Sequence, residues 1–242
     1  HDLESLFGIK SEILPFQNAS IYEGVNINKY DYAKQINILM EEPDILIAPI
    51  RSILEKFSDK KFFEKNHLSL RIGDEISQKE MLNKLTEYGY RRATMVNDIS
   101  EFSIRGDITD IYPPNDNPVR IEFWGDEIVD IRTFDRETQR SLEKGIKEIK
   151  VYPMYKFVIP DKVPDGFPKE LIDQFREERY FEGIEVYQSY FNSALVSVFD
   201  YLKDYIVIFD EKSEIYTKYQ FLAENYEQQY QENLKTQLIY EC

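Results

Sequence analysis

Apolar residues in the first part of the chain follow patterns of both a strand and helices. Residues 44–49 form a short apolar run that Pro49 ends, which is typical of a strand buried on both faces of a parallel sheet. Residues 32–40 have helical spacing, and helical spacing resumes after the run at Ile50, Ile53, Leu54 and Phe57. These segments predict the alternating helices and strands of an α/β layer.

The middle of the chain predicts one helix and several strands. Ser77 and Glu80 have the spacing of a capping box, and apolar residues follow on one helical face as far as Gly89. Gly125 and Asp126 have the chemistry of a two-residue hairpin turn. Because strand-like patterns flank this turn, we expect a small α+β module built on an antiparallel sheet. The predicted strands are residues 102–105, 107–112, 119–124 and 127–134.

The last part of the chain returns to a mixed pattern. Four prolines between residues 153 and 168 mark a loop-rich connection, and a helix is expected at 171–179. Residues 196–202 and 205–209 have strand-like patterns. Residues 215–234 predict a long polar helix that is rich in Tyr, Glu and Gln.

These changes of pattern predict the domain organisation. Residues 1–66 and 153–242 are expected to form two parts of one α/β domain, and residues 67–152 are expected to form an α+β domain inserted between them. The chain begins with His1 rather than Met, and the apolar spacing just after it is typical of the end of a helix. We therefore expect a piece of a longer protein.

Composition and charge narrow the classes of function. The 242 residues are 42% apolar and carry a formal charge of −15, and each of the three predicted parts is acidic. Lys and Arg supply most non-specific affinity for nucleic acid, so a protein partner fits this charge better than DNA does. Cys242 is the single cysteine, and neither a membrane span nor a signal peptide is apparent. We expect a cytoplasmic protein that does not bind membranes.

The strand at residues 119–124 has one face that is unusual for a solvated surface. Period-two geometry places Arg120, Glu122 and Trp124 opposite the apolar face. Trp and Arg are enriched at binding hot spots, and Arg105 on the neighbouring strand could reach the same face. The alternatives are that Trp124 packs over the adjoining turn or a neighbouring domain, and that Arg105 forms an internal salt bridge to Glu122 or Asp107.

Candidate catalytic chemistry is sparse. Residues 206–211 have the apolar-strand-then-Asp-Glu pattern of a Walker B segment, but the Gly-Lys motif that would cradle phosphates is missing. His1 and His67 are too far apart in the sequence to suggest a metal site, and Cys242 has no plausible base nearby. We expect neither a catalytic residue nor a cofactor or metal site.

Longer motifs carry a specific resemblance to a known family. Residues 89–91 read GYR, residues 101–113 read EFSIRGDITDIYP, and residues 118–128 read PVRIEFWGDEI. Together with residues 131–141, these motifs resemble, in the same order, the UvrB-homology module of transcription-repair coupling factors. Residues 138–141 favour this family over UvrB itself, and residues 183–191 resemble the later part of the module.

The resemblance implies a fold and a set of contacts. In that family, a degenerate helicase-like domain with a parallel sheet is split in sequence by an inserted domain that binds UvrA. The family's UvrA contacts match Arg105 in the Arg-Gly pair, Arg120 on the later hairpin strand, and Trp124. Relatives commonly have Phe at the third position, so Trp124 keeps an aromatic anchor but adds an indole donor.

The resemblance also implies a role in transcription-coupled nucleotide excision repair. A non-catalytic interaction module would recruit UvrA to stalled RNA polymerase. RNA polymerase and DNA would be bound by parts of the parent protein, an ATP-dependent translocase, that are absent from this sequence. The alternatives are a UvrB-like, DNA-dependent nucleotide hydrolase that uses Asp210 and Glu211, and a DNA-binding module.

Overall fold

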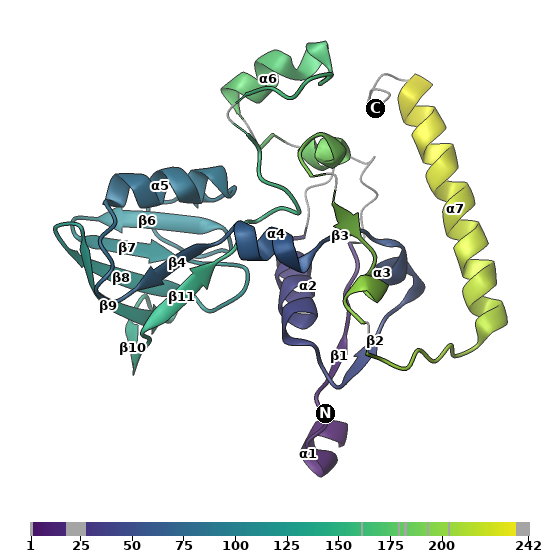
Figure 1. The fold of residues 1–242 in the computed structure, drawn as a ribbon, viewed down its shortest axis with the longest axis horizontal. Helices are drawn as coiled ribbons and strands as arrows, with labels where there is room; N and C mark the ends of the chain where they lie inside the picture. The colour runs from purple at the N-terminus through teal and green to yellow at the C-terminus, as the bar shows by residue number, and fades with distance from the viewer. Residues whose placement is uncertain are drawn as a thin grey trace.

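A computed structural model describes residues 2–17, 28–160, 162–178, 180–181, 183–192, 194–202 and 204–235. Figure 1 shows an antiparallel sheet covered by one helix at one end of the molecule, a group of shorter elements in the middle, and a long helix on the opposite side. The chain is a mixed α/β protein with several separate sheets. The strand-rich middle of the sequence thus forms the region that bears the predicted site.

The six-stranded sheet has the strand order β10-β9-β8-β7-β6-β5 and is antiparallel except for the β5–β6 pair. Glycine with positive φ occupies the first turn position of both β6–β7 (Gly106, φ 61°) and β8–β9 (Gly125, φ 63°), as the predicted hairpin requires. The strand bounds are Arg91–Arg92 (β5), Glu101–Arg105 (β6), Ile108–Ile111 (β7), Val119–Trp124 (β8), Glu127–Phe134 (β9) and Ser141–Gly145 (β10).

Helix α5 (Gln78–Glu87) covers the inner face of this sheet. The Ser77 side chain accepts a hydrogen bond from the backbone N–H of Glu80, so the predicted cap begins the helix. Met81 and Leu85 are fully buried against apolar side chains of the strands. Below them the buried residues of β8 alternate with more exposed ones, which confirms that Val119, Ile121 and Phe123 form its core face.

A second core joins segments that are far apart in the sequence. Leu14, Ile38, Leu39 and Phe57 from the first part of the chain pack with Val198 and Tyr201. Strands β1 (Ser11–Ile13) and β2 (Ile45–Ile47) pair in parallel, and β3 (Phe57–Ser58) pairs antiparallel with β12 (Leu195–Val196). The helices in the first part of the chain are α1 (Asp2–Phe7), α2 (Lys29–Glu41), α3 (Ile50–Leu54) and α4 (Lys60–Lys65).

The connection between these cores contains an aromatic cluster. Antiparallel strands β4 (Leu68–Arg71) and β11 (Glu148–Val151) adjoin the large sheet. A separate apolar core follows, and its buried residues include Phe157, Phe167, Phe175 and Tyr187. The predicted helix at 171–179 is a 3-10 turn, η2 (Lys169–Leu171), followed by α6 (Ile172–Glu177), and its last residue lies outside the described part. A further 3-10 segment, η3 (Ile184–Tyr190), completes this core.

Three predictions for the outer parts of the chain were wrong. Strand β2 is not buried on both faces, because β1 is its single partner among the described strands and Ile47 is 55% exposed. The strand predicted at 196–202 is present only at its first residue, the end of β12, and the chain then forms the 3-10 helix η4 (Val198–Asp200), because Ser197 and Asp200 form a capping box there. Within the described residues, 205–209 pairs with no strand, and Ile206 is 91% exposed.

The long C-terminal helix was predicted correctly. Helix α7 (Lys212–Lys235) projects away from the sheets (Figure 1), and Leu222 is its single buried side chain among those described. Over the described residues, no helix is both long and apolar enough to cross a membrane. His1 and Cys242, which the sequence excluded as candidate sites, lie outside the described residues.

Candidate docking surface

The candidate site lies on the outer face of the six-stranded sheet, opposite α5. Arg105 comes from β6, Arg120 and Trp124 come from β8, and β7 lies between these strands. Register places Asp110 of β7 directly opposite Arg120, and Ile108 opposite both Arg105 and Glu122. Trp124 lies two residues beyond Glu122, so Arg105 and Trp124 are at the same end of the same face.

The two arginines share one buried carboxylate. Arg120 donates from Nε to Asp110 Oδ1 (2.7 Å) and from Nη2 to Asp110 Oδ2 (2.9 Å). Arg105 donates from Nη2 to the same Oδ2. Asp110 is 1% exposed, although it is on the solvent side of the sheet. The internal-salt-bridge alternative for Arg105 was therefore right in kind, but the partner is Asp110 rather than Glu122 or Asp107.

Arg120 is held from several directions. Its Nη1 donates to the Gln139 backbone oxygen (3.2 Å) and to Ser141 Oγ (3.3 Å), and its guanidinium lies 5.0 Å from the centre of the Phe134 ring. The hydrogen bond to Asp110 raises the pKa of Arg120 above its usual value, against the opposing effect of burial. The side chain is 13% exposed. Arg120 is thus fixed within the sheet face.

Arg105 and Trp124 face the solvent instead. The Arg105 side chain is 47% exposed, and Trp124 is 80% exposed beside the Gly125 turn. Neither the turn nor another described segment buries the indole, which excludes the packing alternative for Trp124 in this chain. A single exposed aromatic side chain is common on protein surfaces, but Trp and Arg are the residue types most enriched at binding hot spots.

Sequence reasoning missed Asp110. The residue is in the quoted motif, but its role depends on the β7–β8 register, which places it between two arginines. A second ionic group on the same face was also missed, since Arg132 pairs with Glu122 (2.8 Å) and Asp130 (3.2 Å). The signal that could have found both groups is the alternation of opposite charges at outward positions of adjacent strands.

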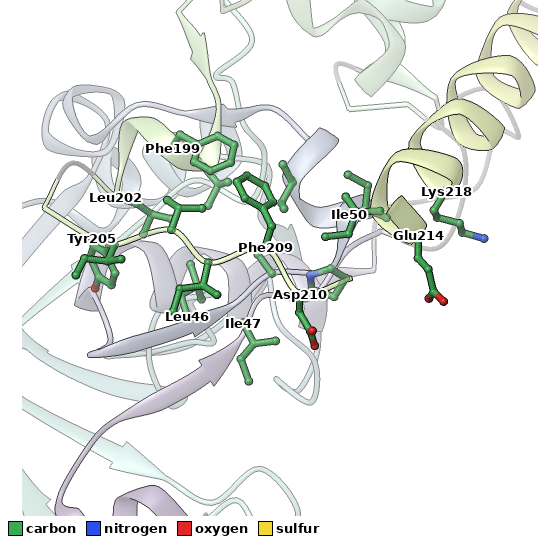
Figure 2. Close-up of a pocket in the computed structure, with 18 of the residues that line it drawn as sticks. Leu46, Ile47, Ile50, Phe199, Leu202, Tyr205, Phe209, Asp210, Glu214 and Lys218 are labelled. Carbon is green, nitrogen blue, oxygen red and sulfur yellow. The ribbon is translucent and has the colours of Figure 1, made fainter. Parts of the chain in front are cut away.

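The Walker B-like segment lies along a separate groove of about 1150 Å³ (Figure 2), and none of the described residues that line this groove belongs to the six-stranded sheet. Leu46, Ile50 and Phe209 line the groove, and Figure 2 shows the Asp210 and Glu214 carboxylates at its edge. Of the described residues that line it, none is a glycine, and Asp210 does not follow a paired strand. The groove therefore offers the apolar walls of a packing surface and lacks the backbone cradle that binds phosphates.

Comparison with known proteins identifies the region that bears this surface. Residues 68–157 match the UvrB interaction domain family. The chain is 38% identical over 135 residues to the transcription-repair-coupling factor of Staphylococcus haemolyticus (strain JCSC1435), covering 56% of this chain and 12% of that protein. It is 31% identical over 248 residues to that of Bacillus subtilis (strain 168), covering 89% of this chain and 21% of that protein.

The resemblance to transcription-repair coupling factors is confirmed. Residues 68–157 are called the UvrB interaction domain below, and they contain Arg105, Asp110, Arg120 and Trp124. The chain spans about an eighth to a fifth of the length of these relatives. The surface described here thus lies within the residues that match the UvrB interaction domain family.

Among the described residues, no group of three or more His, Cys, Asp or Glu side chains has the geometry to hold a metal ion. His67 instead has its Nδ1 3.0 Å from the backbone oxygen of Phe63, next to the Tyr152 ring. The outer face presents groups that are suited to recognition: a guanidinium for a carboxylate and an indole for an apolar pocket.

Proposed function

We propose that the chain is a non-catalytic interaction module that recruits UvrA to a transcription-repair coupling factor at stalled RNA polymerase. The observation that carries the proposal is the exposure of Trp124 and Arg105 at one end of the outer sheet face of the UvrB interaction domain. Both side chains are of the types most enriched at hot spots. The docking surface is defined here as Arg105, Arg120 and Trp124, with UvrA as the partner.

The proposal extends to the organisation of the chain. Residues 1–66 and 153–242 would be two parts of one helicase-like domain, with residues 67–152 inserted. Its support is the core that Leu14 and Phe57 share with Val198 and Tyr201, because the two parts contribute to one set of buried side chains. Tyr201 also donates a hydrogen bond to the backbone oxygen of Ser58 across the same boundary.

The rest of the pathway is assigned to the parent protein. RNA polymerase binding, DNA binding and ATP-driven translocation would belong to segments of the longer protein, and the whole would act in the cytoplasm. The acidic charge of −15 supports this division, because a module that gripped DNA by itself would need clustered basic residues.

The proposal is tested by measuring the affinity of purified UvrA for the chain by titration calorimetry. Trp124→Ala and Arg105→Ala are each expected to weaken binding by roughly 30-fold, which corresponds to ~2 kcal/mol for a hot-spot side chain. Tyr216→Ala is the matched control, because Tyr216 is another aromatic that is 60% exposed but lies on α7. It should bind like the wild type.

Stability separates a binding defect from a folding defect. Because Trp124 is 80% exposed, Trp124→Ala should change the free energy of unfolding by less than about 0.5 kcal/mol. Wild-type affinity in the Arg105→Ala/Trp124→Ala double variant would refute the proposed surface. So would an equal loss of affinity in Tyr216→Ala.

A further inference from the structure

The outer face contains a carboxylate that the proposed docking surface does not explain. Asp110 is on the solvent side of β7 and is nevertheless 1% exposed, because Arg105 and Arg120 cover it. Burying a carboxylate is costly unless charge and hydrogen bonds compensate it, and here two guanidiniums supply three hydrogen bonds. The arrangement places an acidic group at the centre of a surface proposed to attract an acidic partner group.

The two arginines differ in what they can still offer a partner. A guanidinium has five N–H groups, and Arg120 uses four of them on Asp110, Gln139 and Ser141. Arg105 is hydrogen bonded through one Nη atom to Asp110, and almost half of its side chain is exposed. Arg105 can therefore reach a partner carboxylate, whereas the N–H groups of Arg120 are mostly occupied inside the sheet.

We propose that Asp110 is a positioning residue of the docking surface, which holds Arg105 in its binding conformation and is itself fixed by Arg120. The inference rests on the proposed function. Arg105 is presented to a carboxylate of the partner with one edge of its guanidinium already anchored. A free arginine side chain would lose conformational freedom on binding, and the anchor removes part of that loss beforehand.

An electrostatic role and a positioning role of Asp110 predict opposite effects of Asp110→Asn on binding to the partner. The two guanidiniums and Asp110 have a net charge of +1, so removing the carboxylate makes the cluster more positive. If only charge mattered, an acidic partner would bind faster and more tightly. If Asp110 positions Arg105, the complex should dissociate faster, because the guanidinium is no longer held. Association and dissociation rates therefore distinguish the two effects.

The experiment measures both rate constants for UvrA by biolayer interferometry, over a series of salt concentrations, on the full 242-residue chain. Asp110→Asn is expected to raise the dissociation rate about tenfold, with an association rate equal to or above that of wild type. Glu122→Gln is the charge control, because it removes an acidic group from the same face without touching either arginine. It should affect the association rate alone.

Coupling to Arg105 tests the mechanism. In an Arg105→Ala background, Asp110→Asn should have little further effect on dissociation, because the side chain that it positions is gone. An undiminished effect would show that Asp110 acts through folding and would overturn the inference. Wild-type or slower dissociation of Asp110→Asn would also overturn it.

A second variant covers the case in which Asp110→Asn fails to fold. Asp110→Glu keeps the charge but displaces the carboxylate by one methylene, so faster dissociation is expected, and a wild-type rate would overturn the inference. Failure of the proposed function is recognised separately, because Trp124→Ala and Arg105→Ala would then bind like wild type. If those two variants weaken binding but both Asp110 variants do not, the positioning role alone is wrong.

Discussion

Gly89 of the UvrB interaction domain lies too close to a neighbouring ring to leave room for a Cβ atom. It follows α5 with a φ of 82°, and a Cβ atom there would lie 2.7 Å from Cε2 and 2.8 Å from Cδ2 of Tyr155. The Tyr155 ring cannot move freely, because it is stacked on Tyr180 with centroids 4.6 Å apart. Tyr180 in turn donates a hydrogen bond to the Glu87 backbone oxygen (2.5 Å). Gly89→Ala should therefore disturb the contact between α5 and the aromatic connection.

The expected loss of unfolding free energy in Gly89→Ala has two parts. Positive φ costs an L-residue about 1–2 kcal/mol, and forcing a methyl group into a packed site costs roughly 1–3 kcal/mol. Gly73→Ala isolates the first part, because Gly73 has a φ of 92° and a Cβ atom added there would meet nothing within 4 Å. We expect a loss of about 1–2 kcal/mol for Gly73→Ala and about 2–5 kcal/mol for Gly89→Ala.

Urea unfolding followed by circular dichroism measures both losses. In a Tyr155→Ala background the clashing ring is absent. The loss of unfolding free energy that Gly89→Ala causes in this background should therefore equal the loss that Gly73→Ala causes in the wild type. Equal losses for the two glycine variants in the wild-type background would refute the reasoning. That result would mean that α5 does not pack against Tyr155 as described.

Two further predictions concern the interaction domain. Ser77→Ala should lower its stability by about 1 kcal/mol, because the Glu80 N–H loses its acceptor, whereas Ser77→Asp should retain it; equal denaturation midpoints would contradict this. Burial raises the pKa of Tyr90 well above 10.0, which means that the folded state favours the neutral phenol. The stability that the neutral Tyr90 side chain contributes is therefore complete below pH 10.0 and is lost as pH rises through the folded-state pKa. Tyr90→Phe removes the hydrogen bond to the Tyr152 backbone oxygen and should lower the free energy of unfolding by about 1 kcal/mol at pH 7. Above pH 10 its stability should decline less steeply with pH than that of the wild type, as measured by unfolding at a series of pH values. A parallel decline would contradict this.

The strands that the sequence predicted best are those that a local pattern of alternating apolar residues and a turn defines. Residues 119–124 and 127–134 match β8 and β9 from end to end, because alternation and the Gly125 turn fix the hairpin within a few residues. Residues 205–209 are as apolar, but a strand also needs a hydrogen-bonded neighbour, and the described chain supplies none there. Asp110 was missed for a related reason, since cross-strand register is set by distant pairing.

The charges on the outer face bear on the alternative of a DNA-binding module. Arg105, Arg120 and Arg132 form ion pairs on this face, and their partners are Asp110, Glu122 and Asp130. The three positive and three negative groups of these ion pairs leave no excess of positive charge to neutralise phosphates, and binding DNA requires several such contacts. A protein partner needs much less: one oriented guanidinium and one aromatic anchor are enough to define a hot spot. A face that is electrically balanced but presents an exposed indole is therefore suited to protein recognition, and its selectivity would come from geometry more than from net charge.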